Sequence, residues 1–391
     1  MTTVSGSNGG AGSGRRSICG LLYLGFAIAS IGGPIALVSL LPGAAGDALD
    51  SAGLVILLAL AIFAAPLGIW LAYSRGVVTA GGLTAFVDAA AGRRAAVVHG
   101  WIWAFAYFLY LPYTVTYVVY DLLPPVFPGI TAYRGSLELV LPVALVLFAL
   151  CPVRVVLAIL GLLAAAQLIA MAALGVVTYA HTSAPLAEHP GVDGVGRAAG
   201  TTALLFICAS LPLYLGAEIR GGSRTVRRGL LLAFVLVGGF LLFAGIPLSG
   251  VPDELRDTPV PGVAIAQAYS GRELAVAVGL LTAGSVLALI VAEYLALARL
   301  LHWLHGPSVR TLLRVIAVPF VVADVISLAD PDRFYDDLLR PSLAALFVSQ
   351  LVVFAVFPRF RPGRLAIAAA AIGSALAAWG LYTLFQGGAS T

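Results

Sequence analysis

The sequence predicts an all-α integral membrane protein with about eleven transmembrane helices, and composition and apolar patterning support this class. Of its 391 residues, 61% are hydrophobic and 10% are charged, which is too little polar surface to enclose a water-soluble globule of this size. Apolar runs of about 20 residues recur along the chain, and this is the length that a helix needs to cross a bilayer. A membrane β-barrel would need short alternating strands instead, so that class is set aside.

Apolar windows between charged residues and Pro or Gly breaks predict the individual spans. They cover residues 17–41, 52–74, 97–120, 137–152, 155–180, 199–219, 229–250, 273–300, 311–329, 338–357 and 365–386. Residues 1–16 are rich in Gly, Ser and Thr and end in two arginines, which predicts a disordered cytoplasmic tail. The first apolar stretch is too long for a signal-peptide core, so we expect it to remain as the first helix.

Charge bias sets the orientation, because loops rich in Lys and Arg stay in the cytoplasm. The chain contains no lysine, and with a cytoplasmic N-terminus sixteen of its 22 arginines fall in cytoplasmic segments. Acidic residues fall mainly in the outer loops. We therefore expect a multi-pass protein of the cell (inner) membrane with its N-terminus inside. Because the number of spans is odd, the C-terminus is expected outside.

Two predicted spans carry helix-breaking residues near the middle of the bilayer. In the first, Pro34 has no amide hydrogen, and Gly32 and Gly33 disfavour a helix. In the sixth, a proline follows small residues in the segment 206–212. Interrupted helices that open each of two five-helix halves are how inverted-repeat transporters build a midplane site. The two halves would be residues 17–180 and 199–357, with 365–386 as an additional helix.

Three stretches resemble motifs of the amino acid/polyamine/organocation (APC) superfamily, and the resemblance extends over nearly all of the first ten spans. Residues 31–35 (IGGPI) resemble the IGxGI segment of the first helix, and residues 80–101 resemble the run GGxYxY, FG and GW after the second. Residues 216–228 are similar to the signature EExKNPxRxIPR after the sixth, although its Asn and Pro residues are replaced here. The resemblance implies a LeuT-like 5+5 inverted repeat. The short length most resembles compact exporters of neutral amino acids.

In that superfamily a substrate carboxylate meets backbone N–H groups at the break of the first helix, and the amine meets carbonyls at the break of the sixth. Half-helix termini favour the same arrangement, because they expose unpaired N–H and C=O groups. The resemblance places substrate contacts at Ser30, Ile31, Gly32, Gly33 and Pro34 and at Cys208, Ala209, Ser210 and Leu211. No charged side chain lies near either break in the sequence, so we expect a neutral, apolar amino acid as substrate.

Polar residues inside the predicted spans supply further candidates. The third span carries five tyrosines, of which Tyr110, Tyr113, Tyr117 and Tyr120 share a helical face. Tyr107 and Tyr110 lie nearest the midplane and fit simple packing as well as a wall of the substrate pocket. Glu293 in the eighth span could carry a coupling proton or make a structural hydrogen bond, because burying a carboxyl costs several kcal/mol unless it is paired or hydrated. Ser285 is the candidate for sodium coupling. The candidates for a gating or structural ion pair are Glu218, Arg224 and Arg228.

Neither a metal site nor a cofactor is predicted. The three cysteines lie in or beside apolar spans without CxxC or Cys/His spacing, so no disulfide framework is expected either. His99 is expected at the cytoplasmic surface, and Asp324 is expected to be hydrated near the outer end of the ninth span. The predicted partners are an amino acid and the lipid bilayer, with no nucleic acid, and the oligomeric state stays open.

The predicted function is secondary active transport of amino acids by alternating access. Proton coupling is favoured over sodium, and the direction, uptake or export, stays open. The sharpest rival is a membrane enzyme such as a prenyltransferase, because the acidic run at 330–337 resembles a magnesium-diphosphate cluster. Such enzymes need two clusters on the cytoplasmic side, whereas this chain has one, which faces outward. A channel or a sensor on the same fold is a second alternative.

Overall fold

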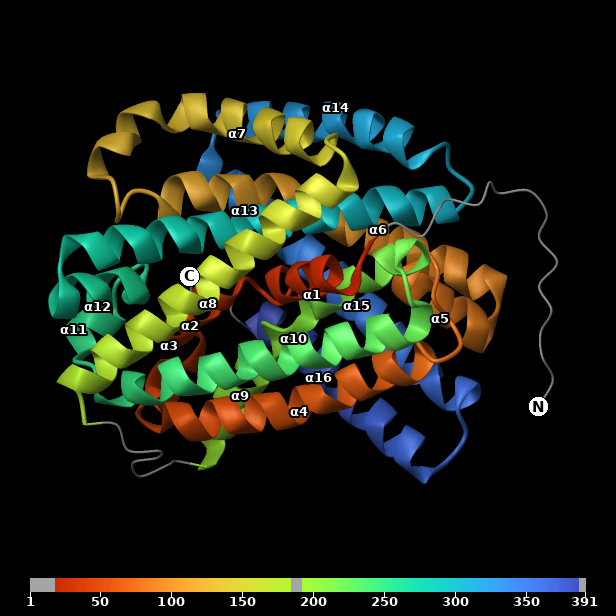
Figure 1. Cartoon of the computed structure of the whole chain (residues 1–391), viewed down its shortest axis with the longest axis horizontal. Helices are drawn as coiled ribbons and strands as arrows, with labels where there is room; N and C mark the ends of the chain where they lie inside the picture. Colours follow the sequence, from red (N-terminus) through yellow and green to blue (C-terminus); the bar gives the residue numbers. More distant parts are fainter. Residues whose placement is uncertain (1–17, 184–191, 387–391) are drawn as a thin grey trace.

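The computed structural model describes residues 18–183 and 192–386, and within these ranges the chain is helical, with one isolated bridge between Ile18 and Ile219 and no β-strand. Figure 1 shows the long helices running largely along one direction. They are α4 (Ala52–Tyr73), α6 (Arg93–Tyr117), α7 (Arg134–Ala149), α8 (Val153–His181), α9 (Val192–Leu204), α10 (Gly222–Gly245), α13 (Arg272–Trp303), α14 (Val309–Ser327), α15 (Pro331–Phe360) and α16 (Arg364–Gln386).

Shorter helical segments complete or connect these helices. The α-helical ones are α1 (Gly20–Ala29), α2 (Pro34–Ser39), α3 (Leu41–Ala45), α5 (Gly82–Ala91), α11 (Asp253–Arg256) and α12 (Pro261–Ser270). The others are the π-helix η2 (Val118–Leu122) and the 3-10 helices η1 (Gly46–Ser51), η3 (Pro128–Tyr133), η4 (Ile207–Glu218) and η5 (Ile246–Gly250).

Ten helical segments of the described chain are long and apolar enough to cross a membrane. The eleventh is α14, which has 19 residues and carries Arg310, Arg314 and Asp324 among apolar side chains. It packs on α6, α7 and α13 and lies beside α7 along one edge of the molecule (Figure 1). A helix is thus present at each of the predicted spans, and the chain is a multi-pass membrane protein.

The first span is interrupted where the sequence predicts it. α1 ends at Ala29 and α2 begins at Pro34. Between them, Gly32 and Gly33 have φ angles of 59° and 70°, in the left-handed region that residues with a side chain rarely adopt. Pro34 fits the first position of α2, because an N–H at that position would have no intrahelical acceptor. The glycines let the chain turn, and the proline starts the next helix.

The sixth span is also interrupted, but slightly earlier than the prediction. α9 ends at Leu204, and the chain continues from Ile207 to Glu218 as the 3-10 helix η4, which contains Pro212. A 3-10 run of 12 residues is unusual, because its hydrogen bonds are poorer than those of an α-helix and such runs seldom exceed three or four residues. The break at Leu205 and Phe206 therefore separates two kinds of helix, which the proline alone did not predict.

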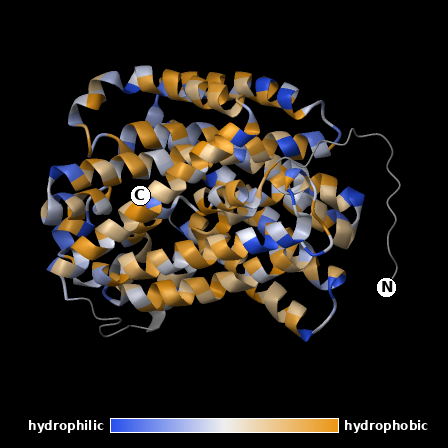
Figure 2. Cartoon of the chain, in the orientation of Figure 1, coloured by the Kyte–Doolittle hydropathy of each residue, from blue (hydrophilic) through white to orange (hydrophobic). Residues whose placement is uncertain are grey.

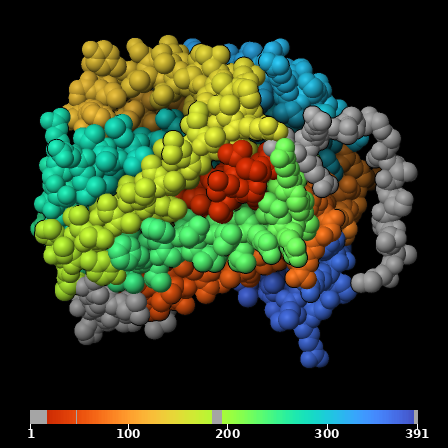
Figure 3. All heavy atoms as spheres, viewed as in Figure 1, coloured from red at the N-terminus to blue at the C-terminus, as the bar shows by residue number. Residues whose placement is uncertain are grey.

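α1 lies at the centre of the molecule, between α8 and α10, and its red surface shows between theirs in Figure 3. Two glycines allow this close approach. A Cβ atom on Gly25 of α1 would lie 2.6 Å from the Cα atom of Gly161 of α8. Small residues bring helix backbones together in a membrane, where packing replaces the hydrophobic driving force. Close packing therefore fixes the first half of the broken span within the bundle.

The outside of the bundle is apolar, as a lipid-facing surface requires. Large hydrophobic side chains such as Leu162, Ile169, Val318 and Leu365 are 65% to 88% exposed. Figure 2 shows hydrophobic residues along the middle of the helices and hydrophilic residues mainly toward their ends. Lipid tails solvate such a surface directly, whereas water would not.

The two ends of the bundle differ in charge. α6 begins at Arg93, whose guanidinium lies 4.1 Å from the ring centroid of Trp303 at the end of α13. The ends of α4 and α15 and the starts of α10, α14 and α16 lie at the same end of the bundle. We call this end the arginine-rich face, because these helix ends carry most of the arginines. At the opposite face, Arg256 of α11 pairs with Asp50 at 2.8 Å.

Candidate functional site

A cavity of about 310 Å³ lies between the two interrupted spans and the helices α6, α13 and α15. Each break contributes a residue to the lining, Gly32 from the first span and Leu205 from the sixth. Tyr110, Leu289 and Leu343 belong to the three continuous helices. None of the 18 described residues that line it is charged. The cavity is therefore a mostly apolar chamber at the level where the α-helical hydrogen bonding of the first span stops and that of the sixth changes to the 3-10 type.

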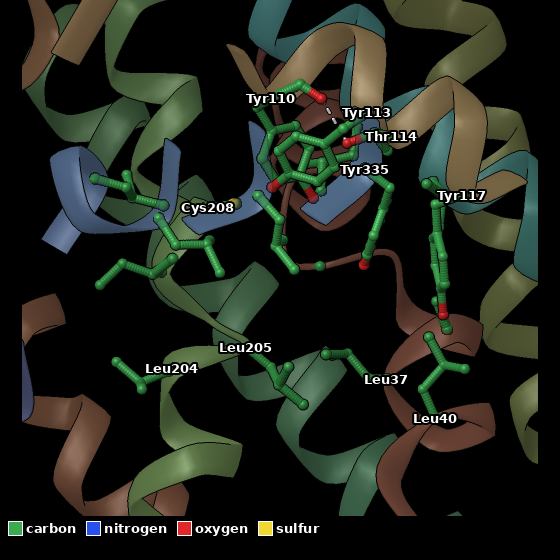
Figure 4. Close-up of a pocket in the computed structure, with 18 residues that line it drawn as sticks. Leu37, Leu40, Tyr110, Tyr113, Thr114, Tyr117, Leu204, Leu205, Cys208 and Tyr335 are labelled. Carbon is green, nitrogen blue, oxygen red and sulfur yellow. Dashed lines mark hydrogen bonds between the residues drawn. The ribbon is translucent and has the colours of Figure 1, made fainter. Parts of the chain in front are cut away.

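Aromatic side chains form one side of the cavity. Tyr110 and Tyr113 of α6 gather there with Tyr335 of α15 (Figure 4), and the Tyr117 ring stacks on that of Tyr335 with the centroids 5.9 Å apart. The Tyr113 ring centroid lies 5.0 Å from that of Tyr110 and 5.5 Å from that of Tyr335, both in edge-on contacts. Thr114 Oγ1 donates a hydrogen bond to the Tyr110 carbonyl at 2.6 Å. The phenol groups provide the polar atoms of an otherwise apolar wall.

Leucines form the other side. Leu37 and Leu40 come from the end of α2, and Leu204 and Leu205 come from the end of α9 (Figure 4). An apolar lining with a few polar groups is typical of sites for small molecules, and this volume falls at the small end of their range. The cavity can therefore hold one small organic molecule.

The two breaks meet at the level of their backbones. A Cβ atom on Gly32 would lie 2.9 Å from the carbonyl oxygen of Leu205. On Gly33 it would lie 2.5 Å from both Cβ and Oγ of Ser285 in α13. Among the described hydrogen bonds, none uses the N–H of Gly32 or of Gly33. Free backbone donors at membrane depth must bind a polar partner, and a carboxylate is a strong one.

The predicted substrate residues all lie around the breaks, but only some of them line the cavity. Gly32, Cys208 and Tyr110 do so. The buried neighbours outside the lining are Ser30, Ile31, Gly33, Pro34, Tyr107, Ala209, Ser210 and Leu211. The hydroxyl of Ser30 donates to the Phe26 carbonyl at 2.8 Å, and that of Ser210 donates to the Ile207 carbonyl at 3.3 Å. Both hydroxyls are therefore used within their own helices.

Cys208 connects the cavity to a buried carboxyl group. Its Sγ atom lies 3.9 Å from Oε1 of Glu293 and 4.0 Å from the hydroxyl oxygen of Tyr107. Glu293 lies on α13 and is fully buried. Its second oxygen, Oε2, has no hydrogen-bond partner among the described residues. A carboxyl group in such a place must bind a proton or a cation to avoid an unpaired buried charge.

Ser285 belongs to a polar seam between α2 and α13. Its Oγ donates to the Thr282 carbonyl at 2.7 Å, and Thr282 Oγ1 donates to Ser39 Oγ at 3.2 Å. Ser285 thus meets the break through its packing on Gly33, while its hydroxyl points back to its own helix. Within the described ranges, no group of three or more His, Cys, Asp or Glu side chains could hold a metal ion.

Glu218 ties the two interrupted spans together near the arginine-rich face. Its carboxylate pairs with Arg299 of α13 at 2.7 Å, and the Arg299 side chain is 4% exposed. The N–H of Ile18 donates to the Glu218 carbonyl at 3.1 Å, and the N–H of Arg220 donates to the Ile18 carbonyl at 2.9 Å. For Arg224 and Arg228 the described part of the chain contains no ion pair. These contacts separate the breaks from this face.

Two residues expected in water are buried. His99 is 1% exposed, and its ring nitrogens lie 3.0 Å from Thr84 Oγ1 of α5 and 3.2 Å from the Ser349 carbonyl of α15. Asp324 is 0% exposed. Both expectations were wrong for the same reason. Position along a span gives depth in the membrane, whereas exposure depends on which helices cover that position.

Other residues of the region had weak or absent signals in the sequence. The Leu205 carbonyl meets Gly32 at the breaks, and any residue could provide a carbonyl, whereas Tyr335 stands within an acidic run. Glu138 did carry a signal, because it is a charged residue inside the predicted span 137–152. The structure shows it fully buried, in contact with α6 and α14.

No protein-family model and no curated protein sequence matches the chain. Solved structures do. The chain is similar to MhsT in complex with L-phenylalanine, with a TM-score of 0.65 and 14% identity over 93% of this chain and 98% of that chain. It is also similar to Mhp1, a nucleobase-cation-symport-1 family transporter with bromovinylhydantoin bound (TM-score 0.56, 13% identity, 96% and 94% covered). A manganese transporter of Eremococcus coleocola is similar too, with a TM-score of 0.56 and 13% identity over 95% of this chain and 88% of that chain.

At these identities the likeness establishes the fold. The chain has the LeuT-like fold of these transporters, a 5+5 inverted repeat with about eleven transmembrane helices, as the sequence predicts.

Proposed function

We propose that the protein is a secondary active transporter of neutral, apolar amino acids that works by alternating access. The observation that carries the proposal is the cavity at the two breaks. It combines a free backbone donor at Gly32, which lines the cavity, and another at the adjacent Gly33 with a lining in which none of the 18 described residues is charged. The amino and carboxylate groups of a substrate would bind to the backbone of the two breaks. A charged side chain would find no counter-ion among the lining residues.

The comparisons support this proposal at the level of class. Two of the similar structures are described as transporters, and the third, MhsT, holds L-phenylalanine. The other two are a manganese transporter and a transporter with bromovinylhydantoin bound, so the substrate class rests on the lining of the cavity and on the resemblance to the APC superfamily. The acidic run at 330–337, which suggested an enzyme, starts a helix. Asp330 accepts a hydrogen bond from the N–H of Arg333 at 3.2 Å, and Arg333 pairs with Asp337 at 3.4 Å.

Proton coupling through Glu293 is part of the proposal. Glu293 is buried behind Cys208, next to the cavity, and can lose and regain a proton without a fixed positive partner. Sodium coupling is less well supported, because the hydroxyl of Ser285 is directed to its own helix. The hydroxyl of Tyr107, a residue of α6, donates to the Cys208 thiol at 4.0 Å. Binding of a proton to Glu293 would therefore change the contacts of Cys208, which lines the cavity.

The proposed orientation places the arginine-rich face in the cytoplasm of a cell with its N-terminus inside. The Glu218 contacts with Arg299 and Ile18 then form the inner gate, which is closed in this structure. The cavity lies on the other side of the breaks, where Tyr117 and Leu40 lead toward the opposite face. Residues 17–180 and 199–357 remain the proposed repeats. Either uptake or export can use this geometry.

Counterflow into proteoliposomes tests the proposed function. Vesicles loaded with leucine should take up labelled leucine, valine and methionine, whereas arginine and glutamate should not compete. Ala36 lines the cavity, so Ala36→Trp should fill it and abolish counterflow. The matched control is Ala61→Trp on the exposed side of α4, which should keep it. Competition by arginine equal to that by leucine would contradict the uncharged site, and absence of any counterflow would favour a sensor or channel.

A further inference from the structure

A second buried carboxyl cluster lies away from the cavity, where α6, α7 and α14 meet. Glu138 of α7 is 0% exposed, and its Oε1 accepts hydrogen bonds from Thr116 Oγ1 of α6 at 2.5 Å and from Ser327 Oγ of α14 at 2.7 Å. Asp324 precedes Ser327 by three residues and so lies on the same face of α14. Ser327 Oγ is also 2.8 Å from the Asp324 carbonyl oxygen. The Ser327 hydroxyl thus lies between the Glu138 carboxyl group and the backbone of Asp324.

Among the described residues, the carboxyl group of Asp324 has neither a hydrogen-bond donor nor a positively charged partner. It is 0% exposed, and neither of its carboxyl oxygens has a hydrogen-bond partner among the described residues. Oε2 of Glu138 has none either. Within the described chain, neither carboxyl group forms an ion pair. Arg134, one turn before Glu138, is directed elsewhere. Its guanidinium donates to the Tyr120 carbonyl at 3.2 Å and lies 5.0 Å from the Tyr120 ring centroid.

Two ionised carboxylates cannot share such a place. Each unpaired charge buried in apolar surroundings costs several kcal/mol, and two like charges add their repulsion. The hydrogen bonds show how the cost is avoided. Thr116 Oγ1 lies 2.5 Å from Glu138 Oε1 and 3.4 Å from the Pro112 carbonyl oxygen, so its proton is directed to Glu138. The Ser327 hydroxyl can share its one proton between Glu138 Oε1 and the Asp324 carbonyl oxygen. These donors favour a negative charge on Glu138, while the Asp324 carboxyl group receives no donor. The arrangement suits one carboxylate and one carboxylic acid.

We propose that Glu138 and Asp324 form a binding site for one proton, separate from Glu293. In the proton-bound form, Asp324 is a neutral acid beside the ionised Glu138. Loss of the proton leaves two negative charges between the three helices and drives α14 and α7 apart. α6 borders both this site and the cavity, since Thr116 contacts Glu138 and the adjacent Tyr117 lines the cavity. Protonation at this site is thereby linked to the helix that forms the cavity wall.

Other titratable groups surround the site from each packed element. Arg134 lies on α7, Tyr120 and Asp121 lie on η2, and Asp332 and Tyr335 lie at the start of α15. On α13, Tyr294 donates to the Leu313 carbonyl of α14, about three turns from Asp324 toward the arginine-rich face. These groups lie at the edge of the site or make contacts with other residues. We therefore assign the proton to the Glu138–Asp324 pair.

Infrared difference spectroscopy tests the site in the purified full-length protein without any substrate. A Glu293→Gln background removes the other buried carboxyl group next to the cavity. We expect this protein to keep a buried carboxylic-acid band that disappears at high pH. Adding Asp324→Asn should abolish the band, whereas Asp332→Asn, at an exposed carboxyl on α15, should leave it unchanged. Thermal stability should fall as the pH rises through the loss of the band, and this fall should be absent with Asp324→Asn.

Glu138→Gln provides a second, independent variant. It removes the negative charge that opposes ionisation of Asp324, so the band should remain at low pH and should be lost at a lower pH than in the parent. A band that survives Asp324→Asn unchanged would overturn the proposal. So would a parent without any buried acid band, or loss of the band on addition of sodium at constant pH, which would identify a metal-cation site. Because no transport is measured, failure here leaves the proposed transport function untouched.

Discussion

Gly33 and Ser285 are in direct contact across the interface between the first span and α13. A Cβ atom on Gly33 would lie 2.5 Å from both Cβ and Oγ of Ser285, and the φ angle of Gly33 is 70°. A side chain at residue 33 would therefore meet two costs at once. It would need a backbone conformation that costs about 1–2 kcal/mol, and it would push the break away from α13.

Replacement of Gly33 should accordingly abolish transport without preventing membrane insertion. Gly33→Ala should reduce uptake in proteoliposomes at least tenfold, and Gly33→Leu should abolish it. Gly68→Ala is the control, because Gly68 is an exposed residue inside α4 and a Cβ atom there meets nothing within 4 Å. That variant should keep uptake. Wild-type uptake by Gly33→Leu would show that the break is a packing feature only.

Glu293→Gln should separate exchange from accumulation. Glutamine keeps the shape of the side chain but cannot carry a proton, so counterflow of leucine should persist while accumulation driven by a pH gradient is lost. The two assays use the same vesicles. Glu254→Gln, at an exposed acid on α11, should affect neither. Unchanged accumulation with Glu293→Gln would remove Glu293 as the proton carrier.

Glu218→Gln should weaken the closure near the arginine-rich face. It leaves Arg299, which is 4% exposed, without its carboxylate, and a buried charge without a partner is costly. Because Glu218 itself is 34% exposed, water offsets part of this cost, and we expect a loss of roughly 1–3 kcal/mol in unfolding free energy. Asp337→Asn, which breaks the exposed pair with Arg333, should cost under about 1 kcal/mol. Equal losses in thermal unfolding would contradict the buried pair.

Reporter fusions test the orientation. A phosphatase that is active only outside the cell should be inactive when fused after Arg228 and active when fused after Asp257, because loops rich in arginine stay in the cytoplasm. Arg228 lies in the first two turns of α10 and Asp257 follows η5, so the two positions flank the apolar segment 229–250. Activity in the reverse order would invert the proposed faces. It would leave the fold itself unchanged.

The spans could be predicted because a bilayer imposes a length and a polarity on each helix. This signal depends only on neighbouring residues in the sequence. It located even α14, which carries three charged residues and is not among the ten segments that are apolar enough to cross a membrane. The break at Gly32 and Gly33 was predictable for the same reason. The residues themselves disfavour a helix, whatever surrounds them.

Contacts between helices could not be predicted in this way. Nothing in the residues around Asp324 indicates that Glu138 faces it from α7, nor that α5 and α15 cover His99. The twelve residues of η4 illustrate the same limit. The choice between 3-10 and α hydrogen bonding along Ile207–Glu218 depends on the neighbours of the segment, so Pro212 predicted a break but not its type or its position.

The 3-10 form of η4 has a mechanical consequence. A 3-10 helix rises about 2.0 Å per residue and an α-helix about 1.5 Å, so twelve residues measure about 24 Å in one form and about 18 Å in the other. Near one end Cys208 touches the chamber between the breaks, and at the other end Glu218 holds Arg299. Rewinding this stretch into an α-helix would shorten it by about 6 Å and would bring Cys208 and Glu218 about 5 Å closer together along the helix axis.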